Sequence, residues 1–221
     1  MIKVDLHVHS CYSDGKERPE FLIDYAKKVA GLDLIAITDH DTSKGAEKVR
    51  GRAILGQEVT TEYGHIVILC DFLPQPPRKI EELIDYSYQN SCILFPSHPF
   101  DITRDGIGDV IFRYINRISF IEVYNSKAPR WANNKALKVA QEYRKIGLAN
   151  SDAHVKDALG SARNFVDSEP RPEDVLEAIR KGKVKPEGVG LSPKAKLSIV
   201  RWFIQRKLGL AENSCRAMRQ V

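Results

Sequence analysis

The first fifteen residues read Met1-Ile2-Lys3-Val4-Asp5-Leu6-His7-Val8-His9-Ser10-Cys11-Tyr12-Ser13-Asp14-Gly15. The run from Ile2 to Leu6 predicts a buried strand that ends in two histidines two residues apart. Side chains at positions i and i+2 of a strand point to the same face, so His7 and His9 can bind one ion together. The Asp-Gly turn then returns the carboxylate of Asp14. Histidine pairs at this spacing also occur by chance, so their meaning depends on the rest of the chain.

The composition is that of a globular protein. With 221 residues, 43% of them hydrophobic, the chain can form one large domain or two small ones with a full core. No apolar run approaches the 18 residues of a membrane span, and no apolar leader follows Met1, so we expect neither a span nor a signal peptide. The four cysteines are Cys11, Cys70, Cys92 and Cys215. Because they lack C-x-x-C spacing, we expect no zinc ribbon and no disulfide framework, Cys11 as a small buried residue, and a reduced, cytoplasmic setting.

The charge is unevenly distributed. The chain carries a net charge of +5, and residues 171–221 contain twelve Lys or Arg against five Asp or Glu. That segment therefore carries +7, and the preceding 170 residues carry −2. A basic tail beside a near-neutral body suits an anionic substrate or partner, although a solvated helix face would give the same pattern.

Strands and helices are predicted to alternate along the chain. The predicted strands are residues 2–6, 34–37, 53–55, 66–69, 92–95, 118–121 and 147–149, with a further short strand at 164–166. The predicted helices are residues 19–30, 79–88, 108–116, 131–145, 172–181 and 192–208. The strands at 53–55 and 66–69 are expected to form a hairpin. The alternation indicates an α/β fold with a mainly parallel sheet.

The ends of the predicted strands favour a barrel. Seven strands ending in polar residues predict a distorted, seven-stranded (β/α)7 barrel, similar to a TIM barrel, with a site at the C-terminal ends of its strands. An open doubly wound sheet remains possible, but no glycine-rich fingerprint follows the first strand.

All six histidines lie at or beside the end of a predicted strand. They are His7, His9, His40, His65, His98 and His154. Carboxylates accompany most of them, and the strongest candidates are Asp14, Glu58 and Asp152. A single histidine is commonly a satisfied core or surface residue. Six at strand ends, with carboxylates and without thiolates, predict a site for zinc, manganese or iron.

These nine residues are enough to hold two divalent ions, or three. Two ions about 3.5–4 Å apart can clamp the attacking and leaving oxygens of a phosphoryl displacement. A hydroxide between them is the expected nucleophile, because metal binding lowers the pKa of water.

The ordered motifs resemble a known family. They are His7-x-His9-Ser10, Ser13-Asp14-Gly15, Thr38-Asp39-His40-Asp41-Thr42, Gly56-x-Glu58, Gly64-His65, Ser97-His98-Pro99 and Ser151-Asp152-x-His154. Across about residues 2–165 the chain resembles the PHP (polymerase and histidinol phosphatase) domain, and most closely its stand-alone members that act on nucleotides or short RNA. The stretch after Asp152 resembles the C-terminal extension of some of these proteins.

The resemblance implies a metal-dependent catalytic barrel over residues 1–165 and a C-terminal extension with a basic helical tail over 166–221. It implies that one ion is held by His7, His9, Glu58 and Asp152. Glu58 would bridge to a second ion held by His65 and His98, and Asp14, His40 and His154 would hold a third. Some relatives carry a histidine in place of Asp14, which implies a weaker third site.

A few further residues are candidates for contacts around the ions. Glu122 is expected as a ligand, as an acceptor for an imidazole N–H, or near the substrate. Arg163, Arg130 and Lys127 follow strand-end motifs and could meet a substrate phosphate, with Arg163 the best candidate. Surface salt bridges are the expected role of Lys127 and Arg130.

Together these features predict a metal-dependent phosphoesterase in which a hydroxide bridging the ions attacks phosphorus. Glu58, Asp152 and His154 are the predicted catalytic residues, with water, His154 or Asp152 protonating the leaving alkoxide. The expected substrate is a small phosphorylated molecule, such as a nucleotide or short RNA or DNA. Two alternatives remain: a hydrolase of C–N or C–O bonds, and a non-catalytic nucleic-acid-binding module. Specificity is expected in the loops 71–78, 99–108 and 124–134.

Overall fold

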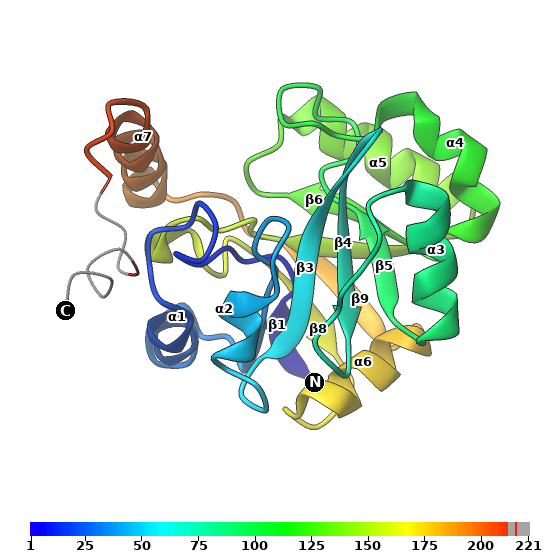
Figure 1. Ribbon diagram of the computed structural model, residues 1–221, viewed down its shortest axis with the longest axis horizontal. Helices are drawn as coiled ribbons and strands as arrows, with labels where there is room; N and C mark the ends of the chain where they lie inside the picture. The colour runs from blue at the N-terminus through cyan, green and yellow to red at the C-terminus, as the bar shows by residue number, and fades with distance from the viewer. Residues whose placement is uncertain (212–214, 216–221) are drawn as a thin grey trace.

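The computed structural model describes residues 1–211 and 215 and has a mixed α/β fold (Figure 1). Seven strands form one curled sheet in the order β5-β4-β3-β2-β1-β8-β9, and β6 pairs with β7 in a second sheet. The strands are β1 (Ile2–Asp5), β2 (Leu34–Ile37), β3 (Ile54–Thr61), β4 (Gly64–Cys70), β5 (Ile93–Pro96), β6 (Phe120–Asn125), β7 (Ile146–Asn150), β8 (Ala162–Val166) and β9 (Val184–Gly188). Because β6 lies against β5, and β7 lies against β8 and β9, the two sheets together form a distorted barrel. The predicted fold class is confirmed.

The barrel is less parallel than the alternation of elements suggested. β1–β2, β2–β3 and β6–β7 are parallel, whereas β3–β4, β4–β5, β1–β8 and β8–β9 are antiparallel. The predicted hairpin is the β3–β4 pair. The sequence did not predict β9, because Pro186 interrupts a stretch without apolar alternation. Proline is tolerated there because β9 is the last strand of its sheet.

The helices follow the predicted pattern with local differences. They are α1 (Pro19–Tyr25), α2 (Lys44–Glu47), α3 (Ile80–Gln89), α4 (Ile111–Tyr114), α5 (Arg130–Glu142), α6 (Pro172–Arg180) and α7 (Pro193–Lys207). α1 continues as a π-helical turn, Ala26–Ala30, and ends at Gly31, whose φ of 67° is readily available only to glycine. The helix predicted at 108–116 is instead α4 flanked by two short 3-10 turns.

The apolar core fixes which end of the barrel is free to hold a site. Side chains of the strands fill the interior, and α6 adds Val175, Leu176 and Ile179 to that cluster. α6 lies beside the start of β1, so it closes the amino-terminal end of the barrel (Figure 1). α3, α4 and α5 cover β4 and β6 on the outside. The opposite end, where most strands finish, is left for polar side chains.

α7 stands apart from the other helices, at the left of Figure 1, and contacts the barrel through Trp202. Ser192 caps the helix by accepting a hydrogen bond from the Ala195 N–H at 3.1 Å. Among residues 1–211 and 215, none of the helices could span a membrane. The predicted division after residue 165 falls within β8 and stays a prediction. Residues 212–214 and 216–221 of the basic tail lie outside the described residues.

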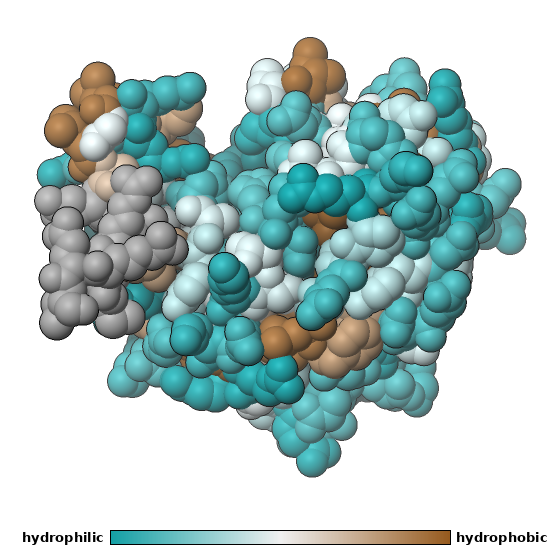
Figure 2. Space-filling model, in the orientation of Figure 1, coloured by the Kyte–Doolittle hydropathy of each residue, from teal (hydrophilic) through white to brown (hydrophobic). Residues whose placement is uncertain are grey.

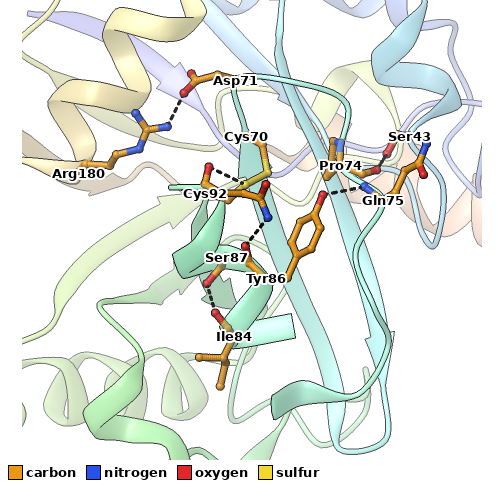
Figure 3. Close-up of a disulfide and its surroundings, with 11 residues drawn as sticks. Ser43, Cys70, Asp71, Pro74, Gln75, Ile84, Tyr86, Ser87, Cys92 and Arg180 are labelled. Atoms are coloured by element: carbon orange, nitrogen blue, oxygen red, sulfur yellow. Dashed lines mark hydrogen bonds and ion pairs between the residues drawn. A yellow bond between two sulfur atoms is a disulfide. The ribbon is translucent and has the colours of Figure 1, made fainter. Parts of the chain in front are cut away.

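Two disulfides correct the expectation drawn from the cysteines. Antiparallel pairing sets Leu69 opposite Ile93, so the adjacent Cys70 and Cys92 meet with their Cα atoms 4.6 Å apart and form a disulfide (Figure 3). Cys11, which is buried as predicted, is bonded to Cys215. Spacing along the sequence does not reveal strand register, and the expectation of no disulfides is wrong. The argument for a reduced compartment loses its basis, and a cytoplasmic location stays a prediction.

Candidate metal centre

The structure brings all nine predicted ligands together at the open end of the barrel. They are His7, His9, Asp14, His40, Glu58, His65, His98, Asp152 and His154. His7, His40, His98 and Asp152 follow the ends of β1, β2, β5 and β7. His65 lies at the start of β4, which runs antiparallel to β3 and therefore begins at the same end.

His7, His9 and Asp152 form the most buried group of ligands. The Nε2 atoms of His7 and His9 lie 3.0 Å apart. These two atoms lie 3.7 and 3.4 Å from Asp152 Oδ1, and 3.2 and 3.1 Å from Glu58 Oε2. Two ring nitrogens at this separation cannot both carry a proton. Both nitrogens face the same carboxylates, so the group is suited to holding a cation.

Glu58 lies at the centre of the cluster and is 1% exposed. His40 Nδ1 is 3.3 Å from its Oε2, whereas His65 Nδ1 and His98 Nε2 are 3.6 and 3.4 Å from its Oε1. Each carboxylate oxygen therefore faces a different set of imidazoles, which is the arrangement that a bridging carboxylate needs. His40 also belongs to the group around Asp14 and His154, to which alone the resemblance assigned it.

The third group consists of His9, Asp14, His40 and His154. Asp14 Oδ1 lies 3.0 Å from His154 Nε2 and 3.8 Å from His40 Nε2. Gly15 makes this turn possible, because a Cβ atom there would lie only 2.3 Å from the carbonyl oxygen of His9. The Ser-Asp-Gly sequence thus holds Asp14 against the histidines.

Several buried ligand atoms have no hydrogen-bond partner among the described residues. They include His9 Nδ1, Asp14 Oδ1 and Glu58 Oε1. Buried polar atoms are nearly always satisfied in folded proteins, and a bound cation would satisfy these. A set of imidazoles and carboxylates without thiolates suits zinc, manganese or iron. The residues present therefore fit divalent metal ions.

The electrostatics of the cluster favour ionised carboxylates. Burial opposes ionisation of Glu58, but the charges of His7 and His40 outweigh it and hold its pKa well below the usual value. Burial likewise opposes charge on His9, yet the hydrogen bonds that its ring donates to Asp152 and Glu58 raise its pKa to about 9. Burial is the main reason that the pKa of His40 falls to about 4. Positive charge is thus stabilised around Glu58 and His9, whereas His40 is neutral near pH 7 and free to bind a metal ion.

Glu122 lies beneath the cluster and is 1% exposed. Its carboxylate accepts hydrogen bonds from His7 Nδ1 at 3.1 Å, the His98 backbone N–H at 2.6 Å, and the side-chain amides of Asn125 and Asn150, both at 2.9 Å. With Nδ1 of His7 donating, its Nε2 lone pair is free for an ion. Glu122 does not line the cavity, so a substrate contact stays a prediction without support from this geometry, and its position fits orientation of His7.

Two of the ligands have strained backbones. The φ angles of His98 and Asp152 are 33° and 53°, in the left-handed region that non-glycine residues rarely adopt. Strain of this kind persists where surrounding structure enforces it, commonly at functional sites. For His98, Glu122 helps to hold this backbone conformation by accepting a hydrogen bond from the His98 N–H.

Two cationic side chains border the cluster on the side of Asp152. Arg104 donates from Nη1 to Asp152 Oδ2 at 2.5 Å and from Nε to Asp101 Oδ2 at 2.8 Å. Lys127 Nζ lies 3.2 Å from Asp152 Oδ1 and 3.1 Å from His154 Nδ1. Sequence reasoning missed Arg104 because its loop carries no motif, and it expected Lys127 on the surface.

The other two predicted substrate residues lie elsewhere. Arg163 donates from Nε to Glu187 Oε2 at 2.6 Å, across the β8–β9 pair. Arg130 is the exposed first residue of α5. Neither lines the cavity above the ligands. Substrate binding by either residue stays a prediction without support from this geometry.

A cavity of about 280 Å³ lies over the cluster, and α7 forms one of its walls. The residues of α7 that line it are Ile199, Trp202, Phe203 and Arg206. Trp202 Nε1 donates to the Asp14 carbonyl at 3.0 Å, and Arg206 Nη1 donates to Asp14 Oδ2 at 2.6 Å. Sequence reasoning did not place α7 here, because 188 residues separate Trp202 from Asp14.

Comparisons with known proteins agree with this architecture. The family model described as PHP-associated matches residues 130–184. The uncharacterized protein MJ1587 of Methanocaldococcus jannaschii is 31% identical over 146 residues, which cover 57% of this chain and 82% of that protein.

Two solved structures have a similar fold. One is a two-domain protein from Bacteroides vulgatus containing a predicted PHP-like metal-dependent phosphoesterase, with a TM-score of 0.70 and 18% identity. The match covers 85% of this chain but only 64% of that one, so the chain spans less than two thirds of its length. The other is Endonuclease Q bound to a 27-mer duplex with an abasic lesion, with a TM-score of 0.60, 20% identity, and coverage of 86% and 60% of the two chains. With its ordered motifs and curled seven-stranded sheet, the chain belongs to the PHP-domain family.

Proposed function

We propose that the protein is a metal-dependent phosphoesterase that hydrolyses the phosphate ester of a nucleotide or short oligonucleotide. The observation that carries this proposal is the convergence of six imidazoles and three carboxylates beside Arg104 and Lys127. Ligands for several ions and cations for an anionic substrate thus share one cavity.

Two or three ions of manganese, zinc or iron would be held by the nine ligands, with Glu58 between neighbouring ions. When bound, such ions act as Lewis acids and make water a stronger acid at neutral pH. In the hydrolysis, a bond from a water oxygen to phosphorus forms as the bond from phosphorus to the ester oxygen breaks, and the leaving alcohol takes up a proton.

Arg104 and Lys127 would serve the phosphoryl group. Guanidinium and ammonium groups stabilise the charge on phosphoryl oxygens when they are already oriented. Here both are fixed by Asp152, at 2.5 and 3.2 Å. The same contacts orient Asp152 as a ligand.

His154 is better suited to binding an ion than to donating a proton. Burial and the charge of Lys127 lower its pKa, so the ring is neutral near pH 7. A neutral imidazole is the form that binds metals. We therefore favour water as the proton donor to the leaving group.

The solved structures support the proposal at the level of fold. One contains a predicted PHP-like metal-dependent phosphoesterase, and the other binds a DNA duplex. The cavity of about 280 Å³ suits a small molecule or a single nucleotide better than a buried duplex.

The test measures hydrolysis before and after removal of metal. The protein is chelated, then reloaded with Mn²⁺ or Zn²⁺, and assayed on nucleoside monophosphates, short RNA and 4-nitrophenyl phosphate, with amides and lactones for comparison. Phosphate release is expected to disappear on chelation and to return on reloading. Glu58→Gln should be inactive, whereas Glu82→Gln, which changes an exposed glutamate of α3, should match the unaltered protein.

Each alternative function gives a different result. Full activity after chelation would contradict the proposal. Turnover of amides or lactones alone would indicate a hydrolase of C–N or C–O bonds. Salt-dependent nucleic-acid binding that survives Glu58→Gln, with no turnover by the unaltered protein, would indicate a binding module.

A further inference from the structure

The cavity over the ligands has an apolar side formed by one helix. Ile199, Trp202 and Phe203 of α7 line it, opposite a floor of imidazoles and carboxylates. Phe203 is 57% exposed. Trp202 is packed against the barrel at 5% exposure. Phe203 is therefore the aromatic ring of this wall that is accessible to a ligand.

Contacts at both ends hold α7 against the cavity. Near its start, Ser198 Oγ donates to Asp157 Oδ2 at 2.7 Å, and Lys194 Nζ lies 2.8 Å from Asp157 Oδ1. Near its end, Trp202 and Arg206 donate to Asp14, as described above. The wall is thus fixed relative to the ligand cluster.

The two polar side chains of this wall are directed toward Asp14. Trp202 Nε1 and Arg206 Nη1 both donate to Asp14. On this wall a flat apolar group would bury against Phe203 and Ile199, whereas a leaving group rich in hydroxyls would meet only the remaining N–H groups of Arg206. Stacking of this kind does not depend on hydrogen bonds, because each aromatic group offers a π face.

Other exposed apolar residues of α7 do not share this position. Leu197, Val200, Ile204 and Leu208 are 70%, 54%, 48% and 65% exposed, and apolar side chains gather on this helix at the left of Figure 2. None of these four lines the cavity. Ile204 follows Phe203 directly and is similarly exposed, which makes it a matched control.

We propose that α7 determines substrate choice: Phe203, supported by Ile199, receives a planar aromatic group of the substrate while Arg104 and Lys127 hold the phosphoryl group. The placement of the phosphoryl group rests on the proposed phosphoesterase function. The contact with the aromatic group rests on the wall itself. Specificity then lies in a helix at the C-terminal end of the chain, as well as in the loops that follow the strands.

The first experiment compares hydrolysis of phenyl phosphate with that of glycerol 3-phosphate, which share a phosphoryl group and differ in the leaving alcohol. Phe203→Ala should lower kcat/KM for phenyl phosphate by about tenfold and leave the value for glycerol 3-phosphate nearly unchanged. Phe203→Trp should retain the preference, and Ile204→Ala should behave as the unaltered protein. Equal losses on both substrates would overturn the proposal.

The second experiment measures binding and does not require turnover. Phenylphosphonate and methylphosphonate carry the same anionic group on a P–C bond that is not hydrolysed. The chain has two tryptophans, so in a Trp131→Phe background Trp202 alone reports binding through its fluorescence. The metal-loaded protein should bind phenylphosphonate about tenfold more tightly than methylphosphonate, and Phe203→Ala should remove the difference.

The two experiments separate the two proposals. Selective, Phe203-dependent binding without hydrolysis of any phosphate ester would refute the phosphoesterase function and support the aromatic subsite. Hydrolysis with no preference for an aromatic group in either experiment would refute the subsite and retain the function.

Discussion

Asp14 is the candidate ligand whose surroundings depart most from a simple metal site. Its Oδ1 faces His154, His40 and His9, whereas its Oδ2 accepts a hydrogen bond from Arg206 at 2.6 Å. A guanidinium at this distance occupies one oxygen and repels a divalent cation. The ion bound by Asp14 should therefore be the weakest of the set.

Removal of the Arg206 charge is expected to strengthen that ion. Arg206→Gln should tighten binding of the last ion by several-fold, because the positive charge beside Asp14 is lost. Calorimetric titration of the metal-free protein with Mn²⁺ measures this. Arg201→Gln, on the same helix but outside the cavity lining, is the control. Unchanged affinity in Arg206→Gln would show that the Arg206–Asp14 pair does not oppose the ion.

Glu122 is expected to act on metal affinity through the residues that it orients. In Glu122→Gln one accepting oxygen becomes an NH2 group. That group would face a donor N–H of His7, Asn125 or Asn150, so at least one of these hydrogen bonds would be lost. Metal affinity should fall by about 10–100-fold, as is typical when such supporting contacts are lost. Circular dichroism verifies that the variant is folded, and unchanged affinity in a folded variant would contradict the assigned role.

The protonation of His9 predicts how metal binding depends on pH. In the metal-free protein its pKa is raised to about 9, so at pH 7 the ring carries a proton that an ion must displace. Binding should release protons at pH 7, and apparent affinity should rise with pH up to about 9. Calorimetry in buffers of different ionisation enthalpy counts these protons, and no net release at pH 7 would contradict the prediction.

At the scale of elements, local sequence carries much of the architecture. Apolar runs located the strands β1 to β8, and Gly31 ended the first helix as predicted. β9 was missed because Pro186 breaks its pattern, and its pairing with β8 is a long-range effect. The Cys70–Cys92 disulfide was missed because it also depends on long-range pairing: the register of β4 and β5 decides that these two cysteines meet.

The Cys70–Cys92 disulfide joins β4 to β5 across a sequence separation of 22 residues and should stabilise the fold. Restricting an unfolded loop of this size contributes about 3 kcal/mol. The double variant Cys70→Ser/Cys92→Ser should lose about that much free energy of unfolding in urea titrations. Reduction of the unaltered protein should have a similar effect, and a double variant of unchanged stability would contradict the contribution.

The site shows the same division between local and long-range information. Most of the nine candidate ligands occupy motifs at strand ends, whereas Glu58 lies within β3 and Asp14 in the turn after β1, and the structure places all nine together. Arg104 lies in a loop without a motif, and only the fold brings it to Asp152. Phe203 and Arg206 lie on α7, which packs against the turn that contains Asp14. No local sequence pattern indicates that contact.

Considered as a whole, the molecule assembles one site from segments spread between His7 and His154. α6 closes one end of the barrel, the strands carry the ligands to the other, and α7 walls the cavity there. An ion that binds only this folded arrangement stabilises it, by about 2.7 kcal/mol at a concentration one hundred times its dissociation constant. Fold, metal binding and catalysis should therefore be coupled.

The most direct test of this coupling is a titration of the metal-free protein with Mn²⁺ in which bound ions per chain and phosphate release are measured on the same samples. We predict two or three bound ions, no phosphate release without metal, and a rise in release as the ions around Glu58 are filled. Glu58→Gln should bind fewer ions and release no phosphate, while Glu82→Gln follows the unaltered protein. Phosphate release at full rate with no bound ion, or full occupancy with no release of phosphate from any ester, would contradict the account.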